Sequence, residues 1–271
     1  MAGDCVRSLD EIRAEINAVT EKSNAARLRE LADELSALNS PEAQALEHDT
    51  RGLSLNLTGY FSEALECYQR AVPLVEQVGD PVLNAKLTGH IGLAYHGMGN
   101  YPKALEHFTA SRDMFDALGD RASMARATSN IGVINFVTGA YAEALEHHNQ
   151  VLALFTELGD RNGMARAKGN IGVVYASTGA YPEAIDYYYR ALAIHEELGN
   201  RQLVAITTDN IGLVYSYTGS AAEALDHYQR ALAMFEELGN RAGQAQLIDH
   251  IGTIHSQSGD YEQALDHFQR A

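Results

Sequence analysis

The chain has 271 residues, of which 46% are hydrophobic and 21% charged, a composition typical of a folded protein and not of a disordered tail. Its formal net charge is −16, with 20 basic against 36 acidic residues, which argues against binding to nucleic acid or anionic membranes. The two cysteines, Cys5 and Cys67, have neither metal-ligand nor disulfide-framework spacing and indicate a reducing compartment.

The N-terminal segment has no apolar core of a secretion signal, and no stretch is long enough to cross a bilayer. These absences predict a soluble, cytoplasmic protein. Residues 8–38 predict two short helices, so we interpret residues 1–41 as an N-terminal helical cap.

From residue 42 onward the sequence repeats every 40 residues. The predicted units are 42–81, 82–121, 122–161, 162–201, 202–241 and a truncated 242–271. Four columns of small residues recur without drift. They are Gly52, Gly92, Gly132, Gly172, Gly212 and Gly252; Gly59, Gly99, Gly139, Gly179, Gly219 and Gly259; Ala64, Ala104, Ala144, Ala184, Ala224 and Ala264; and Ala45, Ala85, Ala125, Ala165, Ala205 and Ala245.

Each unit predicts two helices, because apolar and small residues recur at helical spacing. In the third unit, helix A is predicted over 121–138 and helix B over 141–158. Gly159 suits the left-handed position after a helix, and Asp160 suits the N-cap of the next one. Four of the five prolines stand at predicted helix starts, whereas Pro73 lies inside a helix B and predicts a kink or an early end.

The glycine in the middle of helix A, Gly132 in the third unit, costs about 1 kcal/mol relative to alanine. Its recurrence predicts a close approach of the two helices, with Ala144 of helix B as the facing residue. The column of Gly139 is predicted to close the turn between helices A and B.

These offsets resemble those of tetratricopeptide repeats. Gly132, Asn135, Ala144, His148 and Val151 stand at positions of the family pattern, and the fifth unit is closer to type; its residues are Gly212, Tyr215, Ala224, Tyr228 and Ala231. The resemblance covers roughly residues 42 to 271. The units depart from the consensus of 34 residues by their length of 40 and by the absence of Trp and of the terminal Pro.

The longer form is similar to the repeats of Leu-Gly-Asn polarity adaptors and of bacterial signalling proteins. The resemblance implies an all-α, right-handed superhelical solenoid of antiparallel helix pairs. It also implies a protein-interaction scaffold, without a cofactor, that binds a peptide along the concave face lined by the A helices.

Two other functions stay open. The truncated sixth unit favours a longer protein, in which the array would regulate an output domain such as a nucleotide cyclase, kinase, protease or transcription factor. The same end lacks the polar cap that a solenoid needs, so arrays could also associate with one another into a structural assembly.

The candidate binding surface is a stripe on helix A, on the side opposite its apolar arc at 100° per residue. In this stripe amides can pair with a peptide backbone, aliphatic residues can contact its side chains, and cations favour acidic residues. We therefore predict a groove for a peptide with acidic and apolar residues. The predicted peptide-binding residues are Lys86, His90, Leu93, Arg126, Asn130, Val133, Arg166, Asn170, Val173, Asn210, Leu213, Tyr217 and His250.

Structural roles compete with this interpretation. The asparagines Asn130, Asn170 and Asn210 could instead bond between neighbouring A helices and hold the stack in register. Arg121, Arg161, Arg201 and Arg241 are predicted to make surface or loop contacts. His107, His147, His227 and His267 are attributed to the repeat pattern and not to a metal, since successive repeats should hold them too far apart. Tyr187, Tyr188 and Tyr189 are attributed to packing and surface.

No catalytic residue is predicted. The acidic residues lie mainly on helix B, where they indicate a solvated surface, and every glycine is explained by a turn or a helix contact. Without a nucleophile motif, a carboxylate pair or a phosphate-binding loop, the sequence predicts neither an enzyme nor a metal site.

Overall fold

The structure is a computed structural model that describes residues 7–21 and 24–270. This part of the chain forms fourteen α-helices and no strand, which confirms the predicted all-α class. The helices are α1 (Leu9–Glu21), α2 (Ala25–Ser36), α3 (Pro41–Leu57), α4 (Phe61–Val78), α5 (Pro81–Gly97), α6 (Tyr101–Ala117), α7 (Arg121–Val137), α8 (Tyr141–Leu158), α9 (Arg161–Ser177), α10 (Tyr181–Glu197), α11 (Arg201–Tyr217), α12 (Ala221–Glu237), α13 (Arg241–Gln257) and α14 (Tyr261–Arg270).

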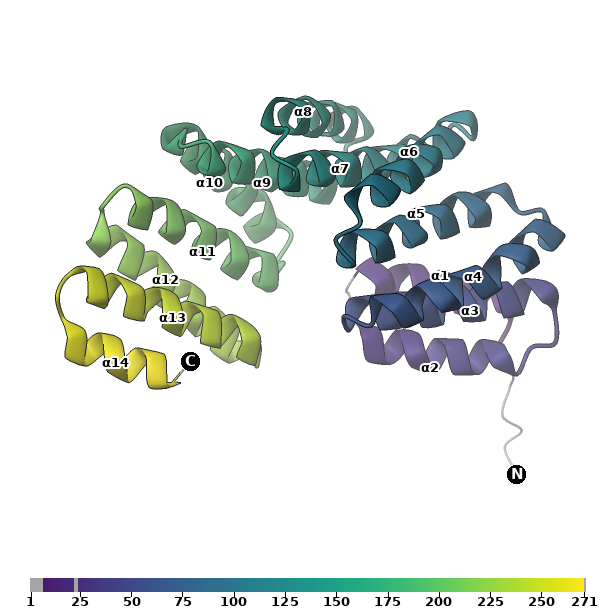
Figure 1. The fold of residues 1–271 in the computed structure, drawn as a ribbon, viewed down its shortest axis with the longest axis horizontal. Helices are drawn as coiled ribbons and strands as arrows, with labels where there is room; N and C mark the ends of the chain where they lie inside the picture. The colour runs from purple at the N-terminus through teal and green to yellow at the C-terminus, as the bar shows by residue number, and fades with distance from the viewer. Residues whose placement is uncertain (1–6, 22–23, 271) are drawn as a thin grey trace. The chain divides into compact units, whose positions relative to one another are not determined.

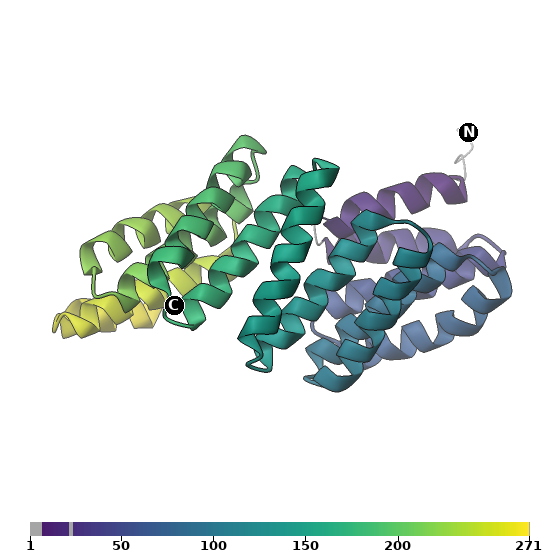
Figure 2. The same cartoon turned by 90° about the horizontal axis from the view of Figure 1, so that it is seen from above.

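The helices group into two compact units, Met1–Thr138 and Gly139–Ala271. In the first unit, α2 to α7 pack in chain order, each helix on the next, and α1 lies against α2 and α3 (Figure 1). In the second unit, α8 to α14 pack in the same consecutive manner (Figure 2). Successive A helices also touch, as α3 does α5 and α11 does α13. Each unit is therefore a stack of paired helices.

The two helices predicted for residues 8–38 are present as α1 and α2. Ile12 and Ile16 of α1 are buried in one cluster with Leu28 and Leu31 of α2, and the cluster continues into the first repeat. The N-terminal helices thus share the core of the first unit. Cys5 lies outside the described residues.

The helix boundaries predicted for the third repeat are confirmed to within one residue by α7 and α8. The side chain of Asp160 accepts a hydrogen bond from the backbone N–H of Gly163, and this satisfies one of the free donors at the start of α9. Gly159 ends α8 with a φ of 69°, a left-handed conformation that glycine adopts without a steric penalty. The turn chemistry therefore sets where α8 ends and where α9 begins.

Pro73 was predicted to kink or shorten its helix, and the early end is wrong. The helix α4 continues through Pro73 to Val78 and has 18 residues, as many as α8. Pro73 is exposed to solvent, so its ring meets no packed neighbour on that side of the helix. The packing of Cys67, Tyr68, Ala71 and Val75 on the buried side keeps the helix whole.

The mid-helix glycines do mark close approaches, but the facing residue is not the alanine that the sequence predicted. A Cβ at Gly172 would lie 2.7 Å from Cε1 of Tyr188, and one at Gly212 would lie 2.8 Å from Cδ1 of Tyr228. The contact is an aromatic ring on helix B, four residues after the alanine column. Alanine allows the helices to approach, and the ring then fills the space above the glycine.

A second glycine contact joins a repeat to the next at two positions, Gly163 and Gly243. A Cβ at Gly163 would lie 2.5 Å from the ring of Phe155, and one at Gly243 would lie 2.8 Å from the ring of Phe235. In both cases an aromatic residue near the end of helix B packs over the first turn of the following helix A. At these two junctions, the repeats therefore stack by pairing a large residue with a position that has no side chain.

Candidate functional site

The predicted binding residues lie on five A helices, α5 and α7 in the first unit and α9, α11 and α13 in the second. Arg126 and Arg166 are exposed, whereas the asparagine column and the aliphatic column beside it are half-buried. Tyr217 is 59% exposed and its ring lies 6.1 Å from that of Tyr181 on the preceding helix B. Within each unit the stripe thus reaches solvent.

The aliphatic residues of the stripe also take part in the core. Leu93 packs against the cluster that contains Phe108, and Val173 packs against the cluster that contains Tyr188. Only one edge of these side chains is left for a ligand. On α11, Tyr217 and Ile206 are more exposed, the latter at 39%.

The two histidines of the stripe make hydrogen bonds to residues of the preceding repeat. Nδ1–H of His90 donates to Oδ1 of Asp49, one repeat earlier, at 2.6 Å. In the same way His250 bonds to Oδ1 of Asp209 at 2.9 Å, while the side-chain amide of Gln246 donates to Oδ2 at 3.0 Å. His90 and His250 therefore hold successive A helices together, and their role as free contacts for a peptide stays a prediction.

The asparagines at the same column behave differently. Among the described residues, the side chains of Asn130 and Asn210 have no hydrogen-bond or ion-pair partner, whereas Asn170 makes an interaction. The residue 41 positions earlier in the sequence is glycine or serine for the asparagines and aspartate for the two histidines. His90 and His250 thus bridge successive A helices, and the register role proposed as an alternative for the asparagines stays a prediction.

The aspartates were missed by sequence reasoning, although the repeat contained the signal. Asp49 and Asp209 are each followed by a histidine 41 residues later, and Gly89, Ser129 and Gly169 are each followed by an asparagine at that spacing. Comparing columns in pairs, and not one at a time, would have predicted the contact.

The chain's own helix α1 lies on part of the predicted surface. Lys86 donates to the side chain of Asn17 at 3.1 Å, and Arg13 pairs with Glu42 and with Asp80, the latter at 3.6 Å. These contacts place α1 against the first turns of α3 and α5. In the first unit, Lys86 is therefore engaged by α1, and the stripe is more open in the second unit.

The arginines that begin the A helices make the surface contacts that were predicted. Arg161 pairs with Glu197, and Arg201 pairs with Glu237, in each case joining the start of helix A to the end of helix B of the same repeat. All four side chains are largely exposed, so each pair contributes about 1 kcal/mol or less. Their role is local.

The histidines on helix B pack against aromatic rings. His107 stacks on Tyr95 at 5.4 Å, and His227 stacks on Tyr215 at 5.4 Å and hydrogen-bonds to the hydroxyl of Tyr189. Burial lowers the pKa of both imidazoles. Within the described residues no group of three or more His, Cys, Asp or Glu is placed to hold a metal ion. The side chain of His267 lies outside the described part.

The three consecutive tyrosines of α10 have separate surroundings, as predicted. Tyr188 is buried, Tyr187 stacks on Tyr175, and Tyr189 is partly exposed. They do not form one site.

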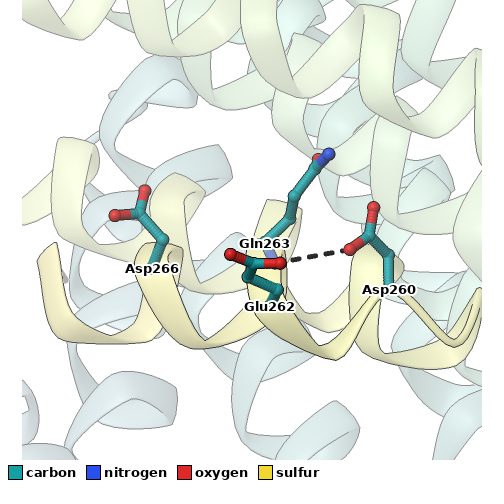
Figure 3. A pocket seen from close by; sticks show the side chains of 4 residues that line it. All are labelled: Asp260, Glu262, Gln263 and Asp266. Carbon is teal, nitrogen blue, oxygen red and sulfur yellow. Dashed lines mark hydrogen bonds between the residues drawn. The ribbon is translucent and has the colours of Figure 1, made fainter.

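A surface hollow on α14 is lined by four polar residues, Asp260, Glu262, Gln263 and Asp266 (Figure 3). The backbone N–H of Gln263 donates to the carboxylate of Asp260 at 3.4 Å, which is a helix-capping contact. Three carboxylates without a nucleophile or an enclosed cavity do not form an active site. Across the described helices, none has both the length and the hydropathy of a membrane span.

Comparisons with known proteins agree with this architecture. A search of curated protein sequences gave no match. Among the solved structures that share the fold is BtubC (BKLC) from P. vanneervenii, with 20% identity, a TM-score of 0.67 and coverage of 78% of this chain and 89% of that one. A Rap protein complexed with Competence and Sporulation Factor has 18% identity and a TM-score of 0.73, and the match covers 96% of this chain and 82% of that one. NprR in complex with its cognate peptide NprX has 19% identity and a TM-score of 0.71, and the match covers 97% of this chain and 80% of that one.

The family model for the tetratricopeptide repeat matches residues 41–117, 123–197 and 203–271, which together make up most of the sequence. The helix pairs, the glycine contacts and the capped turns described above are those of such repeats. This chain belongs to the tetratricopeptide repeat family.

Proposed function

We propose that the chain is a protein-interaction scaffold that binds a peptide segment of a partner along its A helices and has no catalytic step of its own. The observation that carries this proposal is the side-chain amide of Asn210, which is half-buried and has no partner among the described residues. Such an amide can donate to and accept from a peptide backbone. The same chemistry is available at Asn130 in the first unit.

Space beside Asn210 supports the proposal. Gly169 occupies the position that faces Asn210 in the repeat pattern, and a methyl group there would have no heavy atom within 4 Å beyond its own helix. At the next interface the corresponding space holds the carboxylate of Asp209. A peptide backbone that approaches α9 and α11 can therefore reach Asn210 without displacing a side chain of the protein.

The surrounding side chains define the class of peptide. Exposed Arg166 favours an acidic residue, and the exposed parts of Ile206 and Tyr217 favour apolar ones. Two of the structural neighbours were solved with Competence and Sporulation Factor and with the peptide NprX, and the fold is thus compatible with peptide ligands. The partner that we propose is a segment with mixed acidic and apolar residues.

The proposal predicts that Asn210→Ala weakens peptide binding about tenfold, because truncating one partner of a desolvated hydrogen bond costs roughly 1–3 kcal/mol. Peptides are selected from a random display library on the full-length chain, and their affinities are then measured by fluorescence anisotropy. Gln229→Ala, an exposed change on α12, is the matched control.

The melting temperature of both variants should equal that of the parent chain, since Asn210 bonds to no described residue. Equal affinities for Asn210→Ala and Gln229→Ala would contradict the proposal, as would a loss of binding that follows a loss of stability. The regulatory array and the self-assembling array stay predictions, because no contact described above favours either.

A further inference from the structure

One pair of charged residues recurs between neighbouring A helices and is not used by the proposed peptide site. Asp49 with His90 and Asp209 with His250 occupy equivalent positions in different repeats and make the same hydrogen bond. Elsewhere in the repeat pattern, the sequence has Gly89, Ser129 or Gly169 in place of the aspartate and an asparagine in place of the histidine. Carboxylate and imidazole therefore occur together or not at all.

The surroundings of the two pairs are also alike. The aspartate side chains are 6% and 8% exposed, and the histidine side chains 18% and 22%. Each imidazole lies beside a tyrosine ring of the preceding helix B, with centroid distances of 6.0 Å from Tyr68 to His90 and 5.1 Å from Tyr228 to His250. A carboxylate so buried is stable only with a donor, and the strongest donor available is a protonated imidazole.

We propose that the Asp209–His250 pair is a pH-dependent link between repeats, which holds α13 on α11 while His250 is protonated and loosens it when the proton leaves. The Asp49–His90 pair repeats the geometry of this link between α3 and α5. The repeats that have asparagine in place of the histidine carry no titratable group at this position.

The charges around His250 fix the direction of the effect. The hydrogen bond to Asp209 on α11 raises the pKa of His250, burial opposes it, and the nearby Asp249 of its own helix raises the pKa further. On α12 the facing group is Tyr228, whose own pKa is raised by burial, so its phenol stays neutral. Because the folded pKa lies above the unfolded value, the stabilisation is complete below the unfolded pKa, near 6.5, and is lost as the pH rises through the folded one.

The experiment uses the full-length chain and two complementary variants. Asp209→Ser with His250→Asn copies the Ser129 and Asn170 pattern and removes the link. Gly169→Asp with Asn210→His copies the Asp–His pattern into the interface of α9 with α11, where the space above Gly169 can take the carboxylate. Proton NMR follows the Cε1–H signals of the histidines with pH, and His250→Asn identifies the signal of His250.

We expect His250 to titrate above the range of a free imidazole, and Asp209→Asn to return its midpoint toward that range. Amide hydrogen exchange, corrected for intrinsic rates, gives the equilibrium constant for local opening of α13. Between pH 6 and pH 8.5 this constant should rise roughly fivefold more in the parent chain than in the Ser/Asn variant. The reason is that a charge-assisted hydrogen bond, which is lost over this range, is about twice as strong as a neutral one.

The Asp/His variant should acquire a new pH dependence in α11. An unchanged midpoint of His250 in Asp209→Asn would overturn the proposal, and so would equal pH dependence of α13 in the parent chain and the Ser/Asn variant. Neither measurement needs a peptide, so the outcome is independent of the proposed binding function.

Discussion

Gly172→Ala should destabilise the second unit by about 1–3 kcal/mol, whereas Gly169→Ala, three residues earlier in the same helix, should stabilise it by about 0.5–1 kcal/mol. The two glycines differ in what a methyl group would meet. At position 172 the Cβ would lie 2.7 Å from the ring of Tyr188, which is buried, and at position 169 it would have no heavy atom within 4 Å beyond its own helix.

The opposite signs follow from this difference. At Gly169 only the helix propensity of alanine acts, and it favours the folded state. At Gly172 the same propensity gain is outweighed, because the Tyr188 ring must leave its position or α9 and α10 must separate. Urea denaturation followed by circular dichroism measures both changes. If the two variants have equal midpoints, the ring-over-glycine contact does not hold the helix pair together.

His148→Phe should raise stability, and the gain should grow to about 3 kcal/mol as the pH falls to 4. His148 is 1% exposed, and its Nδ1 has no hydrogen-bond partner among the described residues. Burial, with a smaller effect from His147, lowers the pKa of His148 to about 4. The equivalent positions in other repeats hold aromatic rings in place of the imidazole, namely Tyr68, Phe108, Tyr188 and Tyr228.

The sign follows from the number of bound protons. Below pH 6.5 the unfolded chain binds a proton at His148, whereas the folded chain keeps this imidazole neutral. The parent chain therefore loses stability as the pH falls, until the pH reaches the pKa of His148 in the folded state. Denaturation of the parent chain and the variant at pH 7, 6, 5 and 4 gives the difference between their free energies of unfolding. The titration of all other groups cancels in this difference. Parallel curves for the two proteins would show that His148 is not buried in a neutral form.

The repeat period determined most of the fold in advance, since capping residues, glycines and prolines each indicate a local conformation that needs no distant partner. Predictions failed where the outcome depended on contacts across the stack. Pro73 was expected to kink or shorten its helix, and the early end is wrong because tertiary packing on the other side of α4 preserves the length. The glycine column was matched with Ala144 because columns were read singly, whereas the ring four residues later makes the contact.

The candidate site was predictable only in its placement. Helical geometry located the stripe on the A helices, but whether a polar side chain there is free depends on its neighbour in another repeat. Asn210 and His250 have equivalent positions, and only the second faces a carboxylate. The position of α1 was likewise beyond prediction, because the bond from Lys86 to Asn17 joins residues 69 apart that belong to no repeat.

The pairing of a ring with a glycine at the junctions that contain Gly163 and Gly243 has an evolutionary consequence. Gly243 is matched to Phe235, but the residue equivalent to Phe235 one block earlier is His195. An in-frame loss of residues 202–241 would bring Gly243 under the smaller imidazole and His250 opposite Gly169, with both matches lost at once. Although the repeats have similar sequences, their order is constrained. Recombination between them should therefore produce poorly packed junctions more often than folded arrays of new length.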